Sequence, residues 1–150
     1  AMAAGLTIPL DQVESLRERL SATVAAEVSA EDLIPSQDAD LEIPVTEVDQ
    51  AMVATLAVLA PFGNGNPEPR FVSRNVPLLS LTRVGREGAH LKLVVDGGDG
   101  RRLEAIAFRR GDAEVEVGQR LDLLYVPEVR TWRGVRSLQL RVEDLRRSTP

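Results

Sequence analysis

Between two unlike parts of the chain lies the stretch Pro61-Phe62-Gly63-Asn64-Gly65-Asn66-Pro67-Glu68-Pro69-Arg70-Phe71, which has three prolines and two glycines in eleven residues. Proline fixes φ and lacks an N–H donor, and the residue before each proline is pushed towards extended backbone. Glycine opens the left-handed region that other residues rarely enter. Neither a helix nor a regular strand ladder can run through such a segment. The stretch therefore predicts a rigid, shaped connector over residues 61–70.

The parts on either side of the connector differ in charge. Residues 1–60 hold 11 acidic residues and 2 arginines, whereas residues 61–150 hold 12 acidic and 16 basic residues. The net charge of −5 for the whole chain hides this contrast. Only the second part has the sign expected of a surface that meets phosphates. The same modest excess is also ordinary for a protein with no such partner.

The first part alternates short strands and amphipathic helices. Apolar residues recur every three or four positions between Val13 and Val28, which predicts a helix. Residues 3–8 and 41–45 predict short strands. Thr46 has the side chain of an N-cap, with Asp49 at the reciprocal position, and predicts a second helix that ends at the connector. This β-α-β-α order leaves little apolar surface for an independent core.

From Phe71 onward the apolar period changes to two, which is typical of strands. Five strands that suit a small OB-fold barrel are expected, so the chain is α+β; an SH3-like barrel or a sandwich fragment is the alternative. We expect this part to fold alone and the residues after Asp144 to fray. Each strand should place alternate residues on one face: Val76, Leu78 and Ser80, with Leu79 and Leu81 opposite; Leu91, Leu93 and Val95; Leu103, Ala105 and Ala107; Leu121 and Leu123; Leu138, Leu140 and Val142.

The inventory of reactive side chains argues against catalysis by this chain. No cysteine is present, which excludes disulfides and thiolate metal sites and fits a cytoplasmic protein. The one histidine, His90, cannot by itself build a two-metal hydrolytic centre, so no metal or catalytic residue is expected. Asp96 and Asp99 lie among glycines and predict a tight turn. No apolar run reaches the about 18 residues of a membrane helix, so no membrane partner is expected.

The second part instead offers a candidate surface for single-stranded nucleic acid. Such surfaces combine positive charge with aromatic rings on which bases stack. Trp132 lies between Arg130 and Arg133 in the loop expected between the last two strands, a loop that often binds oligonucleotides in OB-folds. The alternative is that Trp132 closes the end of the barrel. Further candidate DNA-binding residues are Arg70, Arg74, Lys92, Arg109 and Arg110.

Four sets of residues carry a family resemblance. They are the connector, the run Ala1-Met2-Ala3-Ala4-Gly5, the strand pair Gly88-Ala89-His90-Leu91-Lys92-Leu93 and Leu103-Glu104-Ala105-Ile106-Ala107-Phe108, and the hairpin residues Trp132-Arg133-Gly134 with Leu138-Gln139-Leu140. Over residues 1–147 the chain resembles RecJ-type single-strand-specific exonucleases. In that family a GGH triplet precedes a similar AMAAG-type run. The resemblance implies that this chain starts just after such a triplet.

The resemblance also implies a non-catalytic piece of a larger enzyme. Residues 1–60 would be the C-terminal part of a DHH-associated domain, and residues 71–147 an OB-fold domain that binds single-stranded DNA. The parent would be a 5′→3′ exonuclease of the DHH family, acting in DNA repair and recombination with Mn²⁺ or Mg²⁺ in a catalytic domain absent here. Its partners would be single-stranded DNA, that catalytic domain and single-strand-binding protein as a further candidate. The alternative is a barrel that docks on other domains or proteins without touching DNA.

Overall fold

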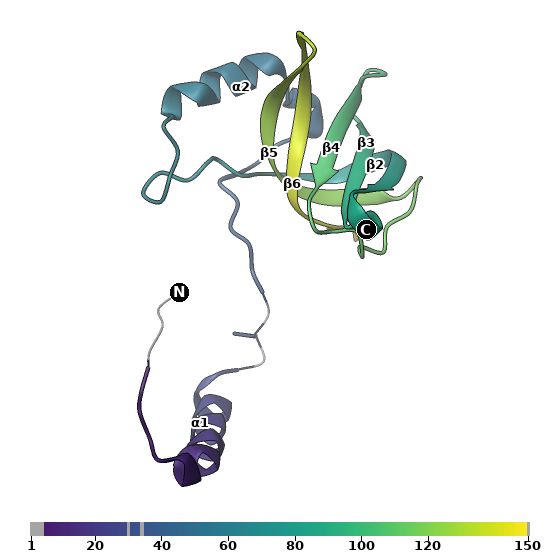
Figure 1. Cartoon of the computed structure of the whole chain (residues 1–150). Helices are drawn as coiled ribbons and strands as arrows, with labels where there is room; N and C mark the ends of the chain where they lie inside the picture. Colours follow the sequence, from purple (N-terminus) through teal and green to yellow (C-terminus); the bar gives the residue numbers. More distant parts are fainter. Residues whose placement is uncertain (1–4, 30, 34, 150) are drawn as a thin grey trace. The chain divides into compact units, whose positions relative to one another are not determined.

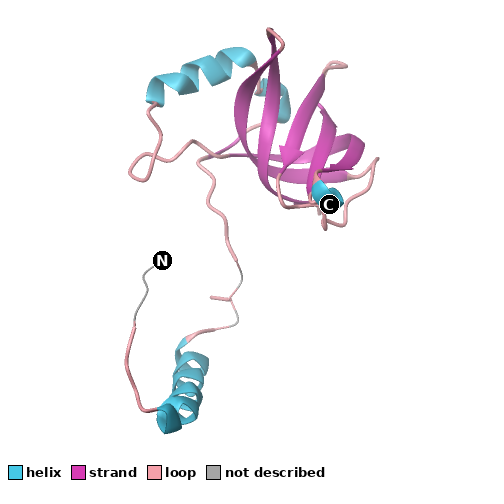
Figure 2. Cartoon of the chain, viewed as in Figure 1, coloured by secondary structure: helices cyan, strands magenta, loops and turns pink. Residues whose placement is uncertain are grey.

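The computed structural model describes residues 5–29, 31–33 and 35–149, apart from the side chain of Trp132. Two compact units divide the chain between Gln37 and Asp38. No helix in the described ranges is long and apolar enough to cross a membrane. The elements in chain order, with η for 3-10 helices, are η1 (Leu10–Gln12), α1 (Val13–Glu27), β1 (Leu41–Glu42), η2 (Val45–Glu47), α2 (Gln50–Leu56), η3 (Ala57–Leu59), β2 (Phe71–Val84), η4 (Arg86–Gly88), β3 (His90–Asp96), β4 (Arg102–Ala107), β5 (Arg120–Trp132) and β6 (Val135–Arg147) (Figures 1 and 2).

The first unit consists of α1 and its flanking segments. The helix expected from the apolar stripe is confirmed over Val13–Glu27, but none of its residues is buried. Leu20 and Val24 on the stripe are 54% and 51% exposed. The strand expected over residues 3–8 is not formed in its described part, residues 5–8. A strand needs a neighbouring strand for its backbone hydrogen bonds, and this unit contributes none to the sheet in the described residues.

The second unit is built around a closed barrel of five strands, β2 to β6 (Figure 1). The sheet order is β2-β3-β4-β6-β5, and β5 pairs with β2 to close it. All neighbours are antiparallel except β4 and β6, which run parallel. Five strands closed in this way form the expected OB-fold, and the α+β fold class is confirmed.

Strand β2 serves two neighbours because it is bent at two irregularities. Its first half pairs with β5 and its second half with β3. The pairing register shifts between Ser73 and Val76 and again between Leu78 and Ser80. Such bulges bend a strand and break its alternation. The expected inward position of Ser80 is therefore wrong: Ser80 is exposed, while Leu81, expected on the opposite face, packs against the core.

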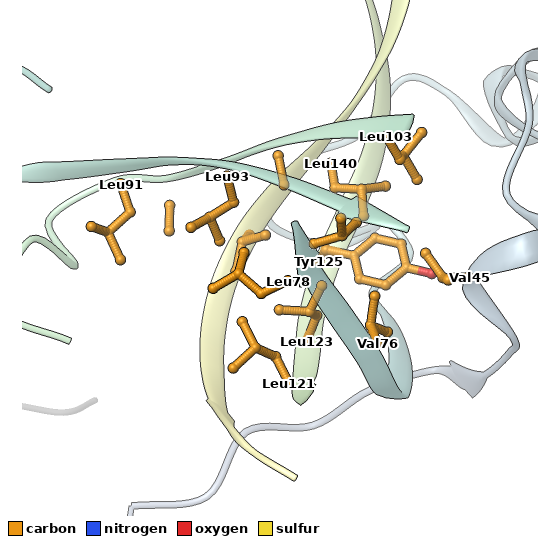
Figure 3. Close-up of a cluster of buried hydrophobic side chains, with 14 of the residues drawn as sticks. Val45, Val76, Leu78, Leu91, Leu93, Leu103, Leu121, Leu123, Tyr125 and Leu140 are labelled. Carbon is orange, nitrogen blue, oxygen red and sulfur yellow. The ribbon is translucent and has the colours of Figure 1, made fainter. Parts of the chain in front are cut away.

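The barrel interior is filled by the residues that alternate along the other strands, as expected (Figure 3). Tyr125 is fully buried among them, with its hydroxyl pointing towards Val45 (Figure 3). The Ser73 hydroxyl donates to the carbonyl of Ile43 (2.8 Å), so the Tyr125 hydroxyl, 2.8 Å from Ser73 Oγ, donates to Ser73. Burial raises the pKa of Tyr125. This relay satisfies the polar atoms that enter the core. Of the strand positions expected to share a face, Leu138 is only partly buried.

Residues before the connector close one end of the barrel. β1 pairs in parallel with β2, and the chain then turns at Pro44, so the expected strand over 41–45 is shorter than predicted. Proline has no N–H donor with which to continue the ladder. Val45 and Val48 are 7% and 0% exposed and belong to the barrel core.

The guanidinium group of Arg101 fixes this closing segment to the β3–β4 hairpin. It donates to the carbonyl oxygens of Thr46 (2.7 Å), Val48 (3.0 Å) and Gly97 (2.9 Å). Gly98 in the same turn approaches the segment so closely that a Cβ there would lie 2.4 Å from the Thr46 side chain. The β3–β4 turn and residues 45–48 are therefore one packed unit.

The second helix begins later than expected. Thr46 lies within η2, and Asp49 itself is the N-cap of α2, accepting from the backbone N–H of Met52 at 2.7 Å. The expected cap at Thr46 is wrong because Val48 enters the core before the helix begins. Met52 and, one turn later, Leu56 pack against the core, so α2 lies on the barrel beside β5 (Figure 1).

The connector is a defined turn attached to the barrel. Gly63 and Asn66 exchange two backbone hydrogen bonds, and the Asn66 side chain donates to the carbonyls of Leu59 and Pro61. Glu68 pairs with Arg141 on β6. The sequence placed residues 38–60 in a preceding domain and 61–70 in a linker; in the structure both lie within the second unit. Which domain of a longer protein each belongs to stays a prediction.

The expected fraying after Asp144 is wrong, because β6 continues to Arg147. The carboxylate of Asp122 holds the strand end: it accepts from Ser148 Oγ (2.7 Å), Arg146 Nε (3.1 Å) and the backbone N–H of Asn75 (3.2 Å). Burial alone would raise the pKa of Asp122, but these hydrogen bonds together outweigh burial and lower it.

The first prediction concerns the folding unit. Residues 38–150 should unfold cooperatively, whereas residues 70–147 should be several kcal/mol less stable, because they lack Val45, Val48 and the carbonyl partners of Arg101. Each buried valine contributes about 1.5–3 kcal/mol, a large share of the roughly 5–15 kcal/mol of a typical domain. Urea denaturation of both segments measures this. Equal stability would show that residues 38–60 do not close the barrel.

The second prediction concerns Asp122. Asp122→Asn should cost about 1.5–3 kcal/mol at pH 7, the range for hydrogen bonds to a charged group. Because folding lowers the pKa of Asp122, its stabilisation is present above about pH 4 and lost as the pH falls below that. The difference between variant and original chain should therefore shrink towards pH 2–3 in urea titrations. The exposed Asp112→Asn is the control, and a difference that stays constant with pH contradicts the prediction.

Candidate nucleic-acid interface

The last two strands extend beyond the barrel as a two-stranded ribbon. The pairing of β5 with β2 reaches only to Tyr125, and that of β6 with β4 begins at Gln139. In the described pairings, residues 129–132 and 135–138 therefore pair only with each other, and this ribbon projects past the other strands (Figure 1). The tip is a two-residue turn, Arg133-Gly134, with φ of 49° and 80°. Two successive positive φ values are typical of the type I′ hairpin turn.

The ribbon carries positive charge without acidic residues. Residues 129–138 contain three arginines and no Asp or Glu. Arg130 lies opposite Ser137, and its guanidinium donates to the neutral amide oxygen of Gln139 (3.3 Å). Arg136 lies opposite Thr131. Directly paired residues share a face and neighbours alternate, so Arg130 and Arg136 occupy opposite faces of the ribbon.

The structure describes the two predicted residues at the tip, Arg133 and Trp132, to different extents. Arg133 is exposed in the turn. The backbone of Trp132 pairs with Val135 next to the turn, but its side chain lies outside the described residues. Whether the indole stacks on bases or closes the barrel therefore stays a prediction. The structure brings Arg130, Trp132 and Arg133 together on one hairpin at the level of the backbone.

Four other candidate residues are held by carboxylates. Their guanidinium or ammonium groups are partly covered and locally neutralised, which lowers their net attraction for a phosphate. The pairs are Lys92–Glu104 (3.3 Å), Arg74–Glu42 (2.8 Å) with Arg74–Asp122 (3.3 Å), Arg110–Asp144 (2.8 Å) and Arg70–Glu143 (3.9 Å). Arg74 lies on β2 and Lys92 on β3, whereas Arg70 precedes β2 and Arg110 follows β4.

The outer face of the sheet is neutralised in the same way. Arg141 on β6 lies among three carboxylates, those of Glu68, Glu128 and Glu143. In the register, Arg141 is opposite Ile106, which in turn is opposite Lys92. The middle of this face therefore holds basic groups that already have acidic partners. On the ribbon, by contrast, the described partner of Arg130 is the neutral amide of Gln139.

Arg109 lies at a sharp turn after β4. Its φ is 58°, and its backbone N–H donates to Nδ1 of His90 (3.0 Å). Its own side chain is exposed and has no ion pair among the described residues. His90 is partly exposed at the start of β3, as the sequence indicated, and its role here is a backbone contact.

Sequence reasoning missed Arg136 and the acidic partners of the other basic residues. Arg136 could have been found, because a two-residue turn at Arg133-Gly134 fixes its place on the hairpin, and residues 129–138 lack acids. The partners of Arg141 and Arg74 could not be found this way. Glu68 and Glu42 are remote in sequence from those arginines and meet them only through tertiary pairing of distant segments.

A divalent metal has no evident site in the part of the chain that the structure describes. Among the residues that the structure describes, no group of three or more His, Asp or Glu side chains could hold a metal ion. Asp96 instead accepts from the backbone N–H of Gly98 (2.9 Å), the turn role predicted for it. The residues present do not fit a Mn²⁺ or Mg²⁺ centre, so no metal-dependent step is assigned to them.

Comparisons with known proteins agree with this architecture. A family model described as the RecJ OB domain matches residues 39–144. The chain is 28% identical to the single-stranded-DNA-specific exonuclease RecJ of Bacillus subtilis, over 95% of this chain and 18% of that protein. It is 33% identical to the enzyme of the same name from Dickeya dadantii, over 97% of this chain and 25% of that protein. It thus spans about a fifth to a quarter of these relatives.

A solved structure shows the same fold. The crystal structure of RecJ in complex with Mn²⁺ from Thermus thermophilus matches with a TM-score of 0.75 and 22% identity, over 97% of this chain and 20% of that chain. A second Thermus thermophilus structure, in complex with Mg²⁺, matches with a TM-score of 0.74. At this identity the likeness concerns the arrangement of the backbone.

Proposed function

The chain belongs to the RecJ OB domain family, and we propose that it is the non-catalytic, strand-holding segment of a RecJ-like 5′→3′ single-stranded-DNA exonuclease. The observation that carries the proposal is the acid-free ribbon with arginines on both faces and a tryptophan beside its turn. Guanidinium groups bind phosphate oxygens, and aromatic faces stack on bases regardless of sequence. Together they would hold a single strand without reading it.

The rest of the parent protein would supply the chemistry. The relatives are four to five times longer than this chain, and hydrolysis with Mn²⁺ or Mg²⁺ would take place in a catalytic domain outside it. The first unit is the part that would pack on that domain, because α1 has no buried residue and exposes the apolar side chains of its stripe. The whole enzyme would act in DNA repair and recombination in the cytoplasm, with single-strand-binding protein as a candidate partner.

A second function, docking on another domain, is favoured by one surface of the barrel unit. Leu41, Val58 and Leu59 are 56%, 82% and 53% exposed around β1 and η3. Apolar residues exposed in this way are common at interfaces between domains. The docking function predicts that the unit binds no DNA, which separates it from the first proposal.

The third prediction tests the strand-holding function through its salt dependence. The whole chain should bind a single-stranded oligonucleotide, with log K falling linearly as log salt rises. Arg130→Gln and Arg136→Gln should each weaken binding and reduce that slope by about 0.7, the value for one phosphate contact on a single strand. Arg74→Gln is the matched control: it removes the same charge, but from an arginine held by Glu42 and Asp122. Fluorescence anisotropy of a labelled oligonucleotide measures all four proteins.

Trp132→Ala completes this test. Loss of a stacked base should cost roughly 1–3 kcal/mol of binding. If the indole instead closes the barrel, the variant should melt at a lower temperature and keep its affinity while folded. An unaltered chain that fails to bind at low salt, or a control arginine that matters as much as Arg130 and Arg136, would contradict the strand-holding function.

A further inference from the structure

The aromatic side chains of the barrel unit differ sharply in exposure. Phe71 and Tyr125 are 5% and 0% exposed and belong to the core. Phe62 is partly buried, whereas Phe108 is 54% exposed. Among the aromatic side chains that the structure describes, Phe108 therefore offers the most open ring face.

Phe108 is held in place by the backbone and by one neighbouring ring. Ala107, the last residue of β4, points into the core, so Phe108 follows on the outer side. The ring of His90 meets it edge-on, with centroids 5.3 Å apart and an interplanar angle of 71°. Such a contact uses only part of the phenyl ring, consistent with its remaining exposure.

The same histidine fixes the turn after Phe108. His90 Nδ1 accepts the backbone N–H of Arg109, which holds Arg109 in the left-handed region at φ 58°. A Cβ on Gly85 would lie 2.9 Å from His90 Cδ2, so the β2–β3 loop packs closely on the imidazole from another side. Gly111 donates its N–H to the carbonyl of Ala89 (3.1 Å), which ties the turn to that loop. Phe108 and Arg109 are thus presented by a rigid corner.

The charge around this corner is positive. The two loops that meet there, residues 83–89 and 108–112, contain four arginines and two acids, although Arg110 pairs with Asp144 of β6 and Arg86 with Glu87. Arg109 has no ion pair in the described part of the chain, and Arg83 donates to the carbonyl of Gly111 (2.9 Å). An exposed ring beside a guanidinium group without an ion pair is the combination that binds single strands.

We propose that Phe108 and Arg109 form a second contact for single-stranded DNA, in which Phe108 stacks on a base, Arg109 binds a neighbouring phosphate and His90 positions both. This inference rests on the proposed function, because it adds a contact to the strand held by the ribbon. Ala107 is opposite Val142 on β6, and Trp132 is opposite Val135. The two contacts are therefore separated by seven residues of β6, about 23 Å of strand. One OB-fold covers about 4–16 nucleotides, enough for one strand to reach both.

The first experiment separates stacking from apolar packing. Phe108→Leu keeps apolar bulk but removes the ring, and should raise the Kd of the whole chain for an oligothymidine of 15 nucleotides about five-fold or more. Phe108→Trp should bind at least as tightly as the original chain. Val117→Ala, at a residue that is 59% exposed in the loop between β4 and β5, is the surface control and should change nothing. Thermal unfolding of each variant confirms that binding is compared between folded proteins.

A second experiment observes the site directly. In a Trp132→Phe background, Phe108→Trp places the only indole of the chain at the corner, and its emission should be quenched as oligothymidine is added. His90→Ala should weaken binding, and His90→Asn, whose side-chain oxygen can accept the Arg109 N–H, should restore part of it. Restoration of binding by His90→Asn is expected only if His90 acts by holding the Arg109 N–H and so positioning the turn.

The outcomes separate this inference from the proposed function. If Arg130→Gln and Arg136→Gln weaken binding while Phe108→Leu binds like the original chain and the indole at position 108 reports no quenching, the second contact is overturned and the ribbon contact stands. If Phe108→Leu weakens binding and the ribbon variants do not, the corner is the main contact and the ribbon assignment falls. If the unaltered chain binds no oligothymidine, both fall.

Discussion

The double bend of β2 is the constraint on which the rest of the molecule depends. One strand pairs with β5 over its first half and with β3 over its second, so the sheet closes only if β2 changes direction between them. The bulge at residues 73–76 lies beside the hydrogen-bond relay from Tyr125 through Ser73 to the carbonyl of Ile43. The same bend therefore orients the buried tyrosine and holds residues 41–43 against β2. Closure of the barrel and attachment of residues 41–43 therefore both depend on this bend of β2.

Closure also decides which basic residues remain available for a ligand. Wrapping the sheet brings Glu68 to Arg141 and Asp144 to Arg110, and the pairing of β1 with β2 brings Glu42 to Arg74; each pair joins segments that are distant in sequence. Exposed pairs of this kind add little stability each. Their larger effect here is on function, because they neutralise basic residues that the sequence offers to a ligand. Arg130 and Arg136 of the hairpin ribbon and Arg109 at the corner after β4 are among the arginines for which no ion pair is described.

Alternation and turn chemistry were enough to predict most of the barrel. The period of two located the five strands, and Asp96 and the glycines after it located the β3–β4 turn. The pattern failed at Ser80, where a bulge shifts alternation by one residue, and at Thr46, because Val48 is drawn into the core before the helix starts. Neither a bulge nor a core position at the barrel end has a local signal in the sequence. They depend on which strands meet.

The same distinction between local patterns and tertiary pairing applies to the candidate site. The hairpin arginines could be found because a two-residue turn with glycine fixes their places, and the outer position of Phe108 follows from the alternation along β4. The carboxylates that pair with Lys92, Arg74, Arg70 and Arg110 lie on other strands. Counting charges along the sequence therefore overestimated the positive charge that these four residues offer to a phosphate. Local patterns thus predict which residues share a face, whereas tertiary pairing determines which charges are free.

Amide chemical shifts of the ¹⁵N-labelled chain during titration with oligothymidine would report whether a single strand lies across both the ribbon and the corner. The largest shifts should fall on residues 107–111 and 129–137, with small shifts for residues 72–75 around the Arg74 ion pairs. Shifts concentrated on residues 72–75 or on α1, with the ribbon and corner unchanged, would contradict it.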